Sequence, residues 1–180
     1  MSEKVFKISQ KSLHTLASRL LAQAAVVAPA RTSGGEVDYD EITSPDQIAW
    51  DYATSLTPLK RFFFPQVEGL FKFSRKEGGV SLQPRLDRKP RVFLGIRPCD
   101  VTAVNFMDSV FARDYEDPYY AARRKDNLLI ALACNQPAEN CFCVCGDAGP
   151  SLESGYDLQL TALDGDYLVE VGSPKGAALA

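Results

Sequence analysis

Two apolar runs with a helical stripe between them dominate the hydrophobic pattern in the middle of the chain. Residues 91–96 and 127–133 are largely apolar over a strand's length, which is typical of strands buried on both faces. After Pro98, a residue favoured in a first helical turn, apolar residues recur at helical spacing: Val101, Val104, Met107 and Phe111. A second short helix is expected over residues 119–125. This order predicts a βαβ unit with parallel strands and a right-handed crossover.

Further elements are expected on both sides of this unit. Leucines at helical spacing predict a helix over residues 8–24, capped by Ser9 or Ser12. Asp164-Gly165 lies between two strand-like segments and predicts a C-terminal hairpin. The remaining expectations are strands at 24–28, 36–39, 156–163 and 167–171, an irregular stretch at 40–65, a short helix or strand within 67–73, turns at 32–35 and 76–79, a solvated basic loop at 84–90, and a helix from Pro174 onward.

The composition fits one folded domain. The chain has 180 residues, 46% of them hydrophobic, and neither an internal repeat nor a low-complexity stretch is evident. We therefore predict a single mixed α/β domain over residues 1–180. With a net charge of −3, the chain shows no basic surface that would indicate nucleic-acid binding. No apolar run is long enough to span a membrane, and the first residues do not resemble a signal peptide. A cytoplasmic protein without a nucleic-acid or membrane partner is expected.

Cysteine usage is the main chemical signal. The chain has one histidine and five cysteines, four of which lie within twelve residues. Cys99 follows the strand at 91–96 and Cys134 follows the strand at 127–133, so both should lie at the same edge of a parallel sheet, where open α/β sheets bind ligands. The loop after Cys134 carries Cys141 and Cys143 to this edge. Four thiolates are thus expected to converge, and the role of Cys145 stays open.

Soft thiolates select zinc, copper(I) or an iron–sulfur cluster. Two isolated cysteines plus one C-x-C are an unusual pattern for a closed zinc site. The spacing alone does not decide between zinc and an iron–sulfur cluster. A third interpretation is that the cysteines are inert buried thiols. The helix that starts at Pro98 should favour a negative charge on Cys99 and lower the pKa of its thiol. Arg97 could donate to a cluster sulfide or form a surface ion pair with Asp100.

Three other features allow two interpretations each. The aromatic run Phe62–Phe64 is interpreted as a buried wedge, although the segment from Lys60 to Phe64 could also dock a partner. The pair Arg123-Arg124 is either a docking surface or solvated charge. His14 is interpreted as a surface residue. The hypothesis of a thiol enzyme based on Cys99 is therefore the weakest, because the chain has no other histidine that could act as the base. No G-x-G-x-x-G follows a strand, so a dinucleotide site is not supported.

Several stretches resemble the amino-terminal domain of the 4Fe-4S dicluster-domain family, which comprises iron–sulfur beta subunits of NAD(P)-linked sulfhydrogenases and the corresponding iron–sulfur component of anaerobic sulfite reductase. The resembling stretches are Pro58–Gln66, Gly95–Asp100, Asp117–Tyr120, Arg123-Arg124, Ala133–Asn135, Cys141–Cys143, Gly149-Pro150, Tyr156–Leu158 and Tyr167–Glu170. The resemblance implies an electron-transfer subunit that relays electrons between a subunit that binds flavin or NAD(P)H and a catalytic subunit, rather than a catalyst by itself.

The resemblance also implies a ligand set and shows two departures. The family's cluster ligands correspond to Cys99, Cys134, Cys141 and Cys143, with a 4Fe-4S cluster as the implied cofactor. The ferredoxin-like half with its C-x₂-C-x₂-C-x₃-C runs is absent, so a fragment or a shortened relative is expected, and Cys145 stands where the family has a small residue. The alternative is a Cys₄ zinc or metal-free module that holds neighbouring subunits together.

Overall fold

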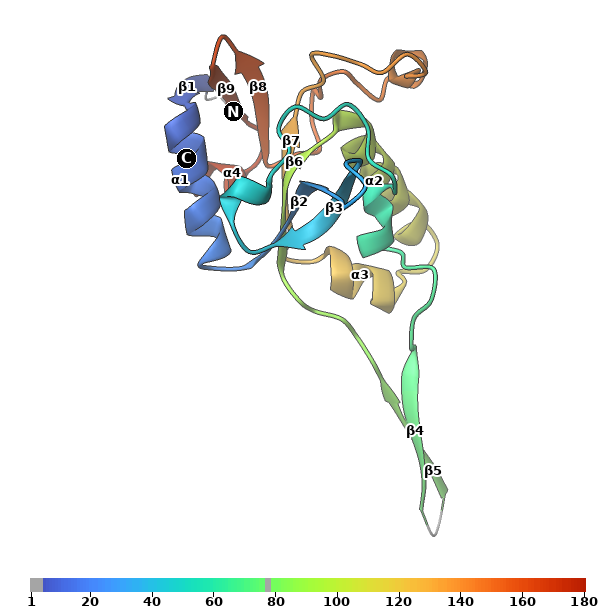
Figure 1. Ribbon diagram of the computed structural model, residues 1–180. Helices are drawn as coiled ribbons and strands as arrows, with labels where there is room; N and C mark the ends of the chain where they lie inside the picture. Colours follow the sequence, from blue (N-terminus) through green and yellow to red (C-terminus); the bar gives the residue numbers. More distant parts are fainter. Residues whose placement is uncertain (1–4, 77–78) are drawn as a thin grey trace.

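The protein is a mixed α/β domain built on a seven-stranded sheet. The computed structural model describes residues 5–76 and 79–180 (Figure 1). The strand order is β1-β9-β8-β7-β6-β2-β3. The four central strands β8, β7, β6 and β2 are parallel, and the outer strands pair antiparallel. The expected mixed α/β fold is therefore confirmed.

The sheet, one separate hairpin and four α-helices account for the regular structure among the described residues. The sheet strands are β1 (Val5–Ser9), β2 (Ala25–Arg31), β3 (Val37–Ile42), β6 (Arg91–Ile96), β7 (Leu128–Leu132), β8 (Leu158–Leu163) and β9 (Asp166–Val171), and the separate hairpin is β4 (Phe71–Lys76) with β5 (Gly79–Pro84). The helices are α1 (Gln10–Leu21), α2 (Pro98–Phe111), α3 (Pro118–Arg124) and α4 (Pro174–Ala177), with three short 3₁₀ turns at Pro45–Gln47, Leu59–Phe62 and Cys143–Gly146.

The predicted βαβ unit forms the centre of the fold. Strands β6 and β7 are buried along nearly their whole length and pair in parallel, with α2 and α3 between them in the chain. Asn127 lies just before β7, and its buried side chain accepts a hydrogen bond from the backbone N–H of Arg91 at 2.8 Å. Figure 1 shows α1 on one side of the sheet and α2 and α3 on the other. The expected C-terminal hairpin is present as β8 and β9.

The first helix is shorter than expected at both ends. Ser9 caps it by accepting a hydrogen bond from the N–H of Ser12. Residues before the cap form β1, which pairs with β9 at the edge of the sheet. The helix ends at Leu21, and β2 begins at Ala25. Strand β2 runs on through Pro29 to Arg31 because its pairing with β6 stops at Val27, so the missing N–H of the proline removes no bond from β6.

The structure differs most from the expectation around residues 67–90. Strands β4 and β5 form a two-stranded hairpin that projects away from the body of the molecule (Figure 1), and we call Phe71–Pro84 the arm. A short helix or strand within 67–73 and a basic loop from Pro84 were expected instead. The turn expected at 76–79 lies partly outside the described residues. No described helix has the length and hydropathy needed to cross a membrane.

The two suggested docking segments are mostly part of the packed interior. Phe63 is fully buried against Phe93 and Phe62 packs on the same ring, whereas Phe64 is 57% exposed, so two rings of the aromatic run form the expected wedge. Arg123 is buried, donates a hydrogen bond to the carbonyl of Phe63 at 3.1 Å and pairs with Glu68. Arg124 pairs with Asp108 at 3.0 Å. The arginine pair is therefore neither free solvated charge nor a free docking surface.

Candidate functional site

Cys99 lies where the chain passes from β6 into α2. Gly95, near the end of β6, has a left-handed φ of +73°, and the register with β7 shifts between Leu94 and Ile96. A bulge of this kind bends the strand and turns the following residues. Pro98 then begins α2, which places Cys99 in its first turn. The sequence expectation for the position of Cys99 is therefore met.

Cys143 approaches the start of α2 from the other side. It lies in the 3₁₀ turn Cys143–Gly146, and the N–H of Ala148 donates to its carbonyl at 3.0 Å. Gly149 fits between Cys143 and Pro98, since a Cβ added to this glycine would lie 3.3 Å from the Cys143 Sγ and 3.5 Å from the Pro98 Cβ. Cys143 and Cys99 are close enough that a charge on Cys143 affects the ionisation of Cys99.

Cys134 is joined to the same region through the backbone. It follows β7, and its N–H donates to the carbonyl of Pro150 at 2.9 Å. Pro150 is the residue after Gly149, so the segment that seats Cys143 also contacts Cys134. Cys134 and Cys143 are half-buried, and none of the five cysteines forms a disulfide.

Cys141 and Cys145 lie on the exposed side of this loop. The N–H of Cys141 donates to the carbonyl of Ala138, and the N–H of Cys145 donates to the carbonyl of Phe142. Within residues 5–76 and 79–180, no three His, Cys, Asp or Glu side chains are grouped so that they could hold a metal ion. The structure thus brings Cys99 and Cys143 together, places the backbone of Cys134 beside them, and does not gather all four proposed ligands.

The pKa of Cys99 is raised, contrary to the sequence expectation. Cys99 is exposed at the molecular surface, but the protein atoms around its sulfur partly desolvate it. This desolvation is the largest cause, followed by the charges of Asp100 and Cys143, and together they raise the pKa of the thiol to about 11. Backbone N–H groups at the start of α2 do lower the pKa of Cys99, as expected, but they contribute less. The thiol is therefore largely protonated at neutral pH in the metal-free protein, which does not favour a nucleophilic role.

Arg97 is buried beneath the site. Its guanidinium donates to the carbonyls of Leu132 and Ala133 at 3.4 and 3.3 Å, and its Nε donates to the carbonyl of Ala53 at 3.3 Å. The same group stacks on the ring of Tyr52, 4.0 Å from the centroid. Arg97 is thus not a surface residue paired with Asp100, as one interpretation held. It fixes the end of β7, immediately before Cys134.

A buried pair of tyrosines holds the other side of the α2 N-terminus. Tyr39 and Tyr52 contact through their hydroxyls at 2.8 Å, Tyr39 donates to Asp100 at 2.8 Å, and Tyr52 donates to the carbonyl of Gly95 at 2.9 Å. Burial raises the pKa of Asp100, although hydrogen bonds from Tyr39 and Leu59 act in the opposite direction. The sequence offered no signal for these contacts, because most of them join residues more than forty positions apart.

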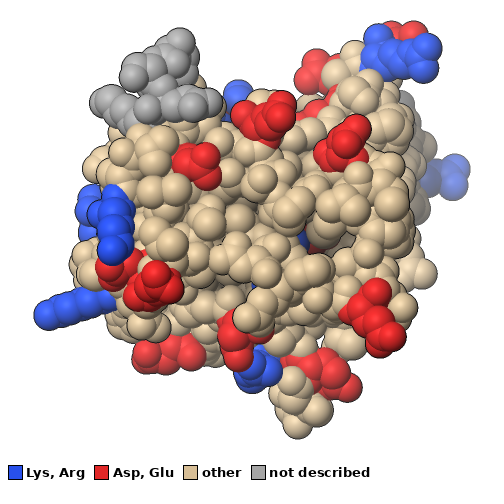
Figure 2. All heavy atoms as spheres, turned by 90° about the horizontal axis from the view of Figure 1, so that it is seen from above, with Lys and Arg blue, Asp and Glu red and all other residues tan. Residues whose placement is uncertain are grey.

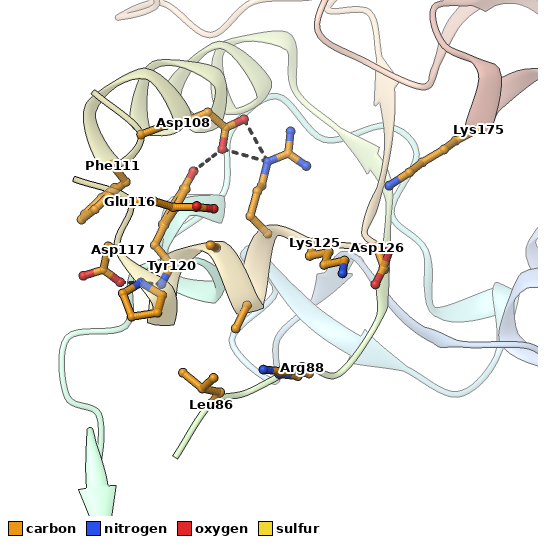
Figure 3. A pocket seen from close by; sticks show the side chains of 15 residues that line it. Leu86, Arg88, Asp108, Phe111, Glu116, Asp117, Tyr120, Lys125, Asp126 and Lys175 are labelled. Carbon is orange, nitrogen blue, oxygen red and sulfur yellow. Dashed lines mark hydrogen bonds and ion pairs between the residues drawn. The ribbon is translucent and has the colours of Figure 1, made fainter. Parts of the chain in front are cut away.

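One hollow among the described residues lies away from the cysteines. It has a volume of about 660 Å³ between the end of α2, α3 and the segment after β5. Figure 3 shows the Asp108 carboxylate facing Tyr120, whose hydroxyl donates to it at 2.6 Å. His14 lies on the surface, as expected, with its Nε2 3.2 Å from Asp46. Neither feature adds a ligand to the cysteine site.

One curated protein provides the comparison for this chain. Sulfhydrogenase 2 subunit beta of Pyrococcus furiosus is 30% identical over 160 residues, which cover 88% of this chain and 46% of the relative. The chain therefore spans about half the length of the relative it matches, and it is a distant homologue of that hydrogenase subunit. No family model matches the sequence, and no solved structure matches it significantly.

Proposed function

We propose that this chain is an electron-transfer domain of a multi-subunit oxidoreductase of the hydrogenase or sulfite reductase type. Cys99, Cys134, Cys141 and Cys143 are its proposed ligands for an iron–sulfur cluster of the 4Fe-4S type. The observation that carries the proposal is the approach of Cys99 and Cys143, thiols from distant segments, at the end of β6 beside the end of β7. The homology to a hydrogenase beta subunit supports it.

The chemistry of the donors fits such a cofactor. All five thiols are free, and the chain has no imidazole near them that would compete for a metal. When bound, an iron–sulfur cluster supplies a one-electron carrier whose potential depends on nearby hydrogen bonds and solvent exposure. The proposal requires the loop with Cys134 and Cys141 to close on the Cys99–Cys143 pair. It also requires Cys99 to release a proton on binding, since its thiol pKa is about 11.

Residues around the thiols would hold the segments that carry Cys99 and Cys134 in place. Arg97 holds the end of β7 in front of Cys134, and the hydroxyl of Tyr39 fixes Asp100 beside Cys99. Backbone N–H groups at the start of α2 face Cys99 and stabilise negative charge there. Proposed partners are a subunit that binds flavin or NAD(P)H and a catalytic subunit, because the homologue is itself named as a subunit.

Anaerobic purification or reconstitution with iron and sulfide tests the proposal. The expected result is a brown protein whose broad visible absorption bleaches on reduction, with iron and acid-labile sulfide in near-equal amounts. A colourless protein with one zinc per chain would instead establish the Cys₄ zinc module. A protein that takes up neither metal would establish a metal-free interaction module, and both results contradict the cluster.

The ligand set is tested by serine variants. Cys134→Ser and Cys143→Ser are expected to lose most of the bound iron and to unfold at lower temperature, because metal binding contributes to folding when loops supply the ligands. Cys145→Ser is the matched control, since Cys145 lies in the same 3₁₀ turn as Cys143 and is expected to keep its iron. Equal iron loss from Cys145→Ser would show that the ligand set is wrong.

A further inference from the structure

The arm has one apolar face and one polar face. In the antiparallel pair β4–β5, Phe71 lies opposite Pro84, Phe73 opposite Leu82, and Arg75 opposite Val80. Directly opposed residues share a face of a hairpin, and every second residue along a strand returns to that face. Five of these six residues are therefore apolar on one face, while the alternate positions carry Lys72, Ser74, Ser81 and Gln83.

The apolar face of the arm has nothing to cover it within the described chain. Phe73 is 73% exposed and Leu82 is 62% exposed, although they form the centre of the face. The arm is fixed only at its root, where the N–H of Arg85 and the hydroxyl of Tyr119 both donate to the carbonyl of Leu70. An isolated two-stranded hairpin is marginally stable in water, so this face needs a covering surface.

Charge favours an acidic covering surface. The arm, residues 71–84, contains three Lys or Arg and one Glu, a net charge of +2. The other 166 residues contain 17 Lys or Arg and 22 Asp or Glu, a net charge of −5. Figure 2, which views the molecule from the end opposite the arm, shows more acidic than basic side chains on that face. The body of this protein is thus complementary in charge to its own arm.

The body also offers an exposed apolar surface next to acidic residues. Phe106 and Val110, one turn apart on α2, are 69% and 52% exposed. Asp114 and Glu116 follow the end of this helix, and neither carboxylate forms an ion pair within the described chain, although Arg113 adds one positive charge just before Asp114. We call Phe106, Val110, Asp114 and Glu116 the α2 surface.

We propose that the arm is a self-association element whose apolar face packs on the α2 surface of a second copy of this chain. Arg75, which lies on the same face as Phe71 and Phe73, is then near Asp114 and Glu116 of the second copy. Strands of six residues reach roughly 20 Å, so two copies related by a twofold axis can each extend the arm to the other body. Such a reciprocal exchange closes on itself as a dimer and does not continue as a filament.

Light scattering on the metal-free chain of 180 residues is the first test, so its outcome is independent of the cluster. The wild type is expected at twice the 19.8 kDa of one chain. Phe73→Ser with Leu82→Ser should raise the dimer dissociation constant by at least about tenfold, because buried aromatic and aliphatic anchors dominate interfaces. Leu163→Ser, an exposed apolar residue in β8, is the control and should leave the dimer intact.

A charge exchange then tests the contact itself. Arg75→Glu should weaken the dimer at low salt, and adding Asp114→Lys in the same chain should restore it. Circular dichroism shows whether each variant is folded. A wild type that is monomeric at about 100 µM, roughly a hundredfold excess over a micromolar dissociation constant, would overturn the proposal. It would also be overturned by a dimer that survives the serine variants, or by an Arg75→Glu variant that Asp114→Lys does not rescue.

Discussion

At the scale of single residues, the position of Cys99 at a helix N-terminus does not determine the ionisation of its thiol. Its place in the first turn of α2 brings N–H groups toward the sulfur, which alone would favour the thiolate. Partial burial and the nearby charges of Asp100 and Cys143 outweigh this effect. Without a metal, the sulfur is therefore held as a thiol close to a second thiol, which is a poor arrangement for a nucleophile.

Alkylation of the metal-free protein tests this ionisation. At pH 8, Cys99 should react with iodoacetamide at least about tenfold more slowly than a thiol in an unfolded peptide, because only the thiolate reacts and the Cys99 pKa is about 11. Its rate should rise with pH until about pH 11, where an ordinary thiol has already reached its plateau. Mass spectrometry of the Cys99 peptide measures the rate. Rapid, selective modification of Cys99 at pH 8 would contradict the raised pKa and revive a thiol-enzyme function.

The positions of Cys99 and Cys134 at the ends of their strands could be predicted from the sequence, but the surroundings of the thiols could not. Cys99 and Cys134 each follow an apolar run of strand length, so the topology of a βαβ unit was enough to place them at one edge. The pKa of Cys99 depends on burial and on charges brought in from the Cys143 segment. The Tyr39–Asp100 contact likewise joins residues 61 positions apart, and no local sequence pattern predicts it.

At the scale of elements, the bulge at Gly95 determines where the end of β6 places Arg97 and Cys99. Gly95 has a left-handed backbone and its carbonyl accepts from Tyr52, while the next residues carry Arg97 and Cys99. A Cβ at this position would lie 3.3 Å from a ring carbon of Trp50. The glycine is therefore required both for its backbone conformation and for the close approach of the indole.

Substitution of this glycine should be costly. Gly95→Ala is expected to lower the free energy of unfolding by about 2 kcal/mol, from backbone strain plus the Trp50 contact. Gly165→Ala is the matched control, because Gly165 also has a left-handed φ but a Cβ there would contact nothing within 4 Å. Urea denaturation followed by circular dichroism measures both. If Gly95→Ala cost no more than Gly165→Ala, the bulge would not be constrained by Trp50.

The elements differ in how far local sequence determines them. The βαβ unit was predictable because its apolar runs and helical stripe are continuous in the chain. Strand β1 was not, because it is defined by pairing with β9, about 160 residues away. The arm had a readable signal, the alternation of Phe71 with Phe73 and of Val80 with Leu82. This alternation was not interpreted as a hairpin from the sequence, because the arm does not pack against the hydrophobic core.

At the scale of the whole molecule, the arm and the thiols lie at opposite ends of β6. The chain enters β6 from the arm and leaves it toward Cys99, and the seven-stranded sheet lies between them (Figure 1). Changes at one end should therefore affect the other only weakly. This separation also allows self-association and cofactor uptake to be measured independently.

Removal of the arm should leave the body folded. Replacing residues 71–84 by two glycines is expected to change the melting temperature of the monomer by less than about 3 °C, because the arm contributes nothing to the buried core. The ends of the removed segment are already adjacent, since the N–H of Arg85 donates to the carbonyl of Leu70 at 2.9 Å. Thermal unfolding at low protein concentration measures the effect. A large loss of stability would mean that the arm supports the body.

The thiols also enclose a defined stretch of the chain. About 35 residues separate Cys99 from Cys134, and these residues form the whole α2–α3 crossover. Any chemical bridge between the two sulfurs, metallic or organic, would tie this crossover into a closed ring and restrict the denatured chain by roughly 3–4 kcal/mol. A cross-linker that spans both positions should therefore make the α2–α3 crossover unfold only together with the sheet.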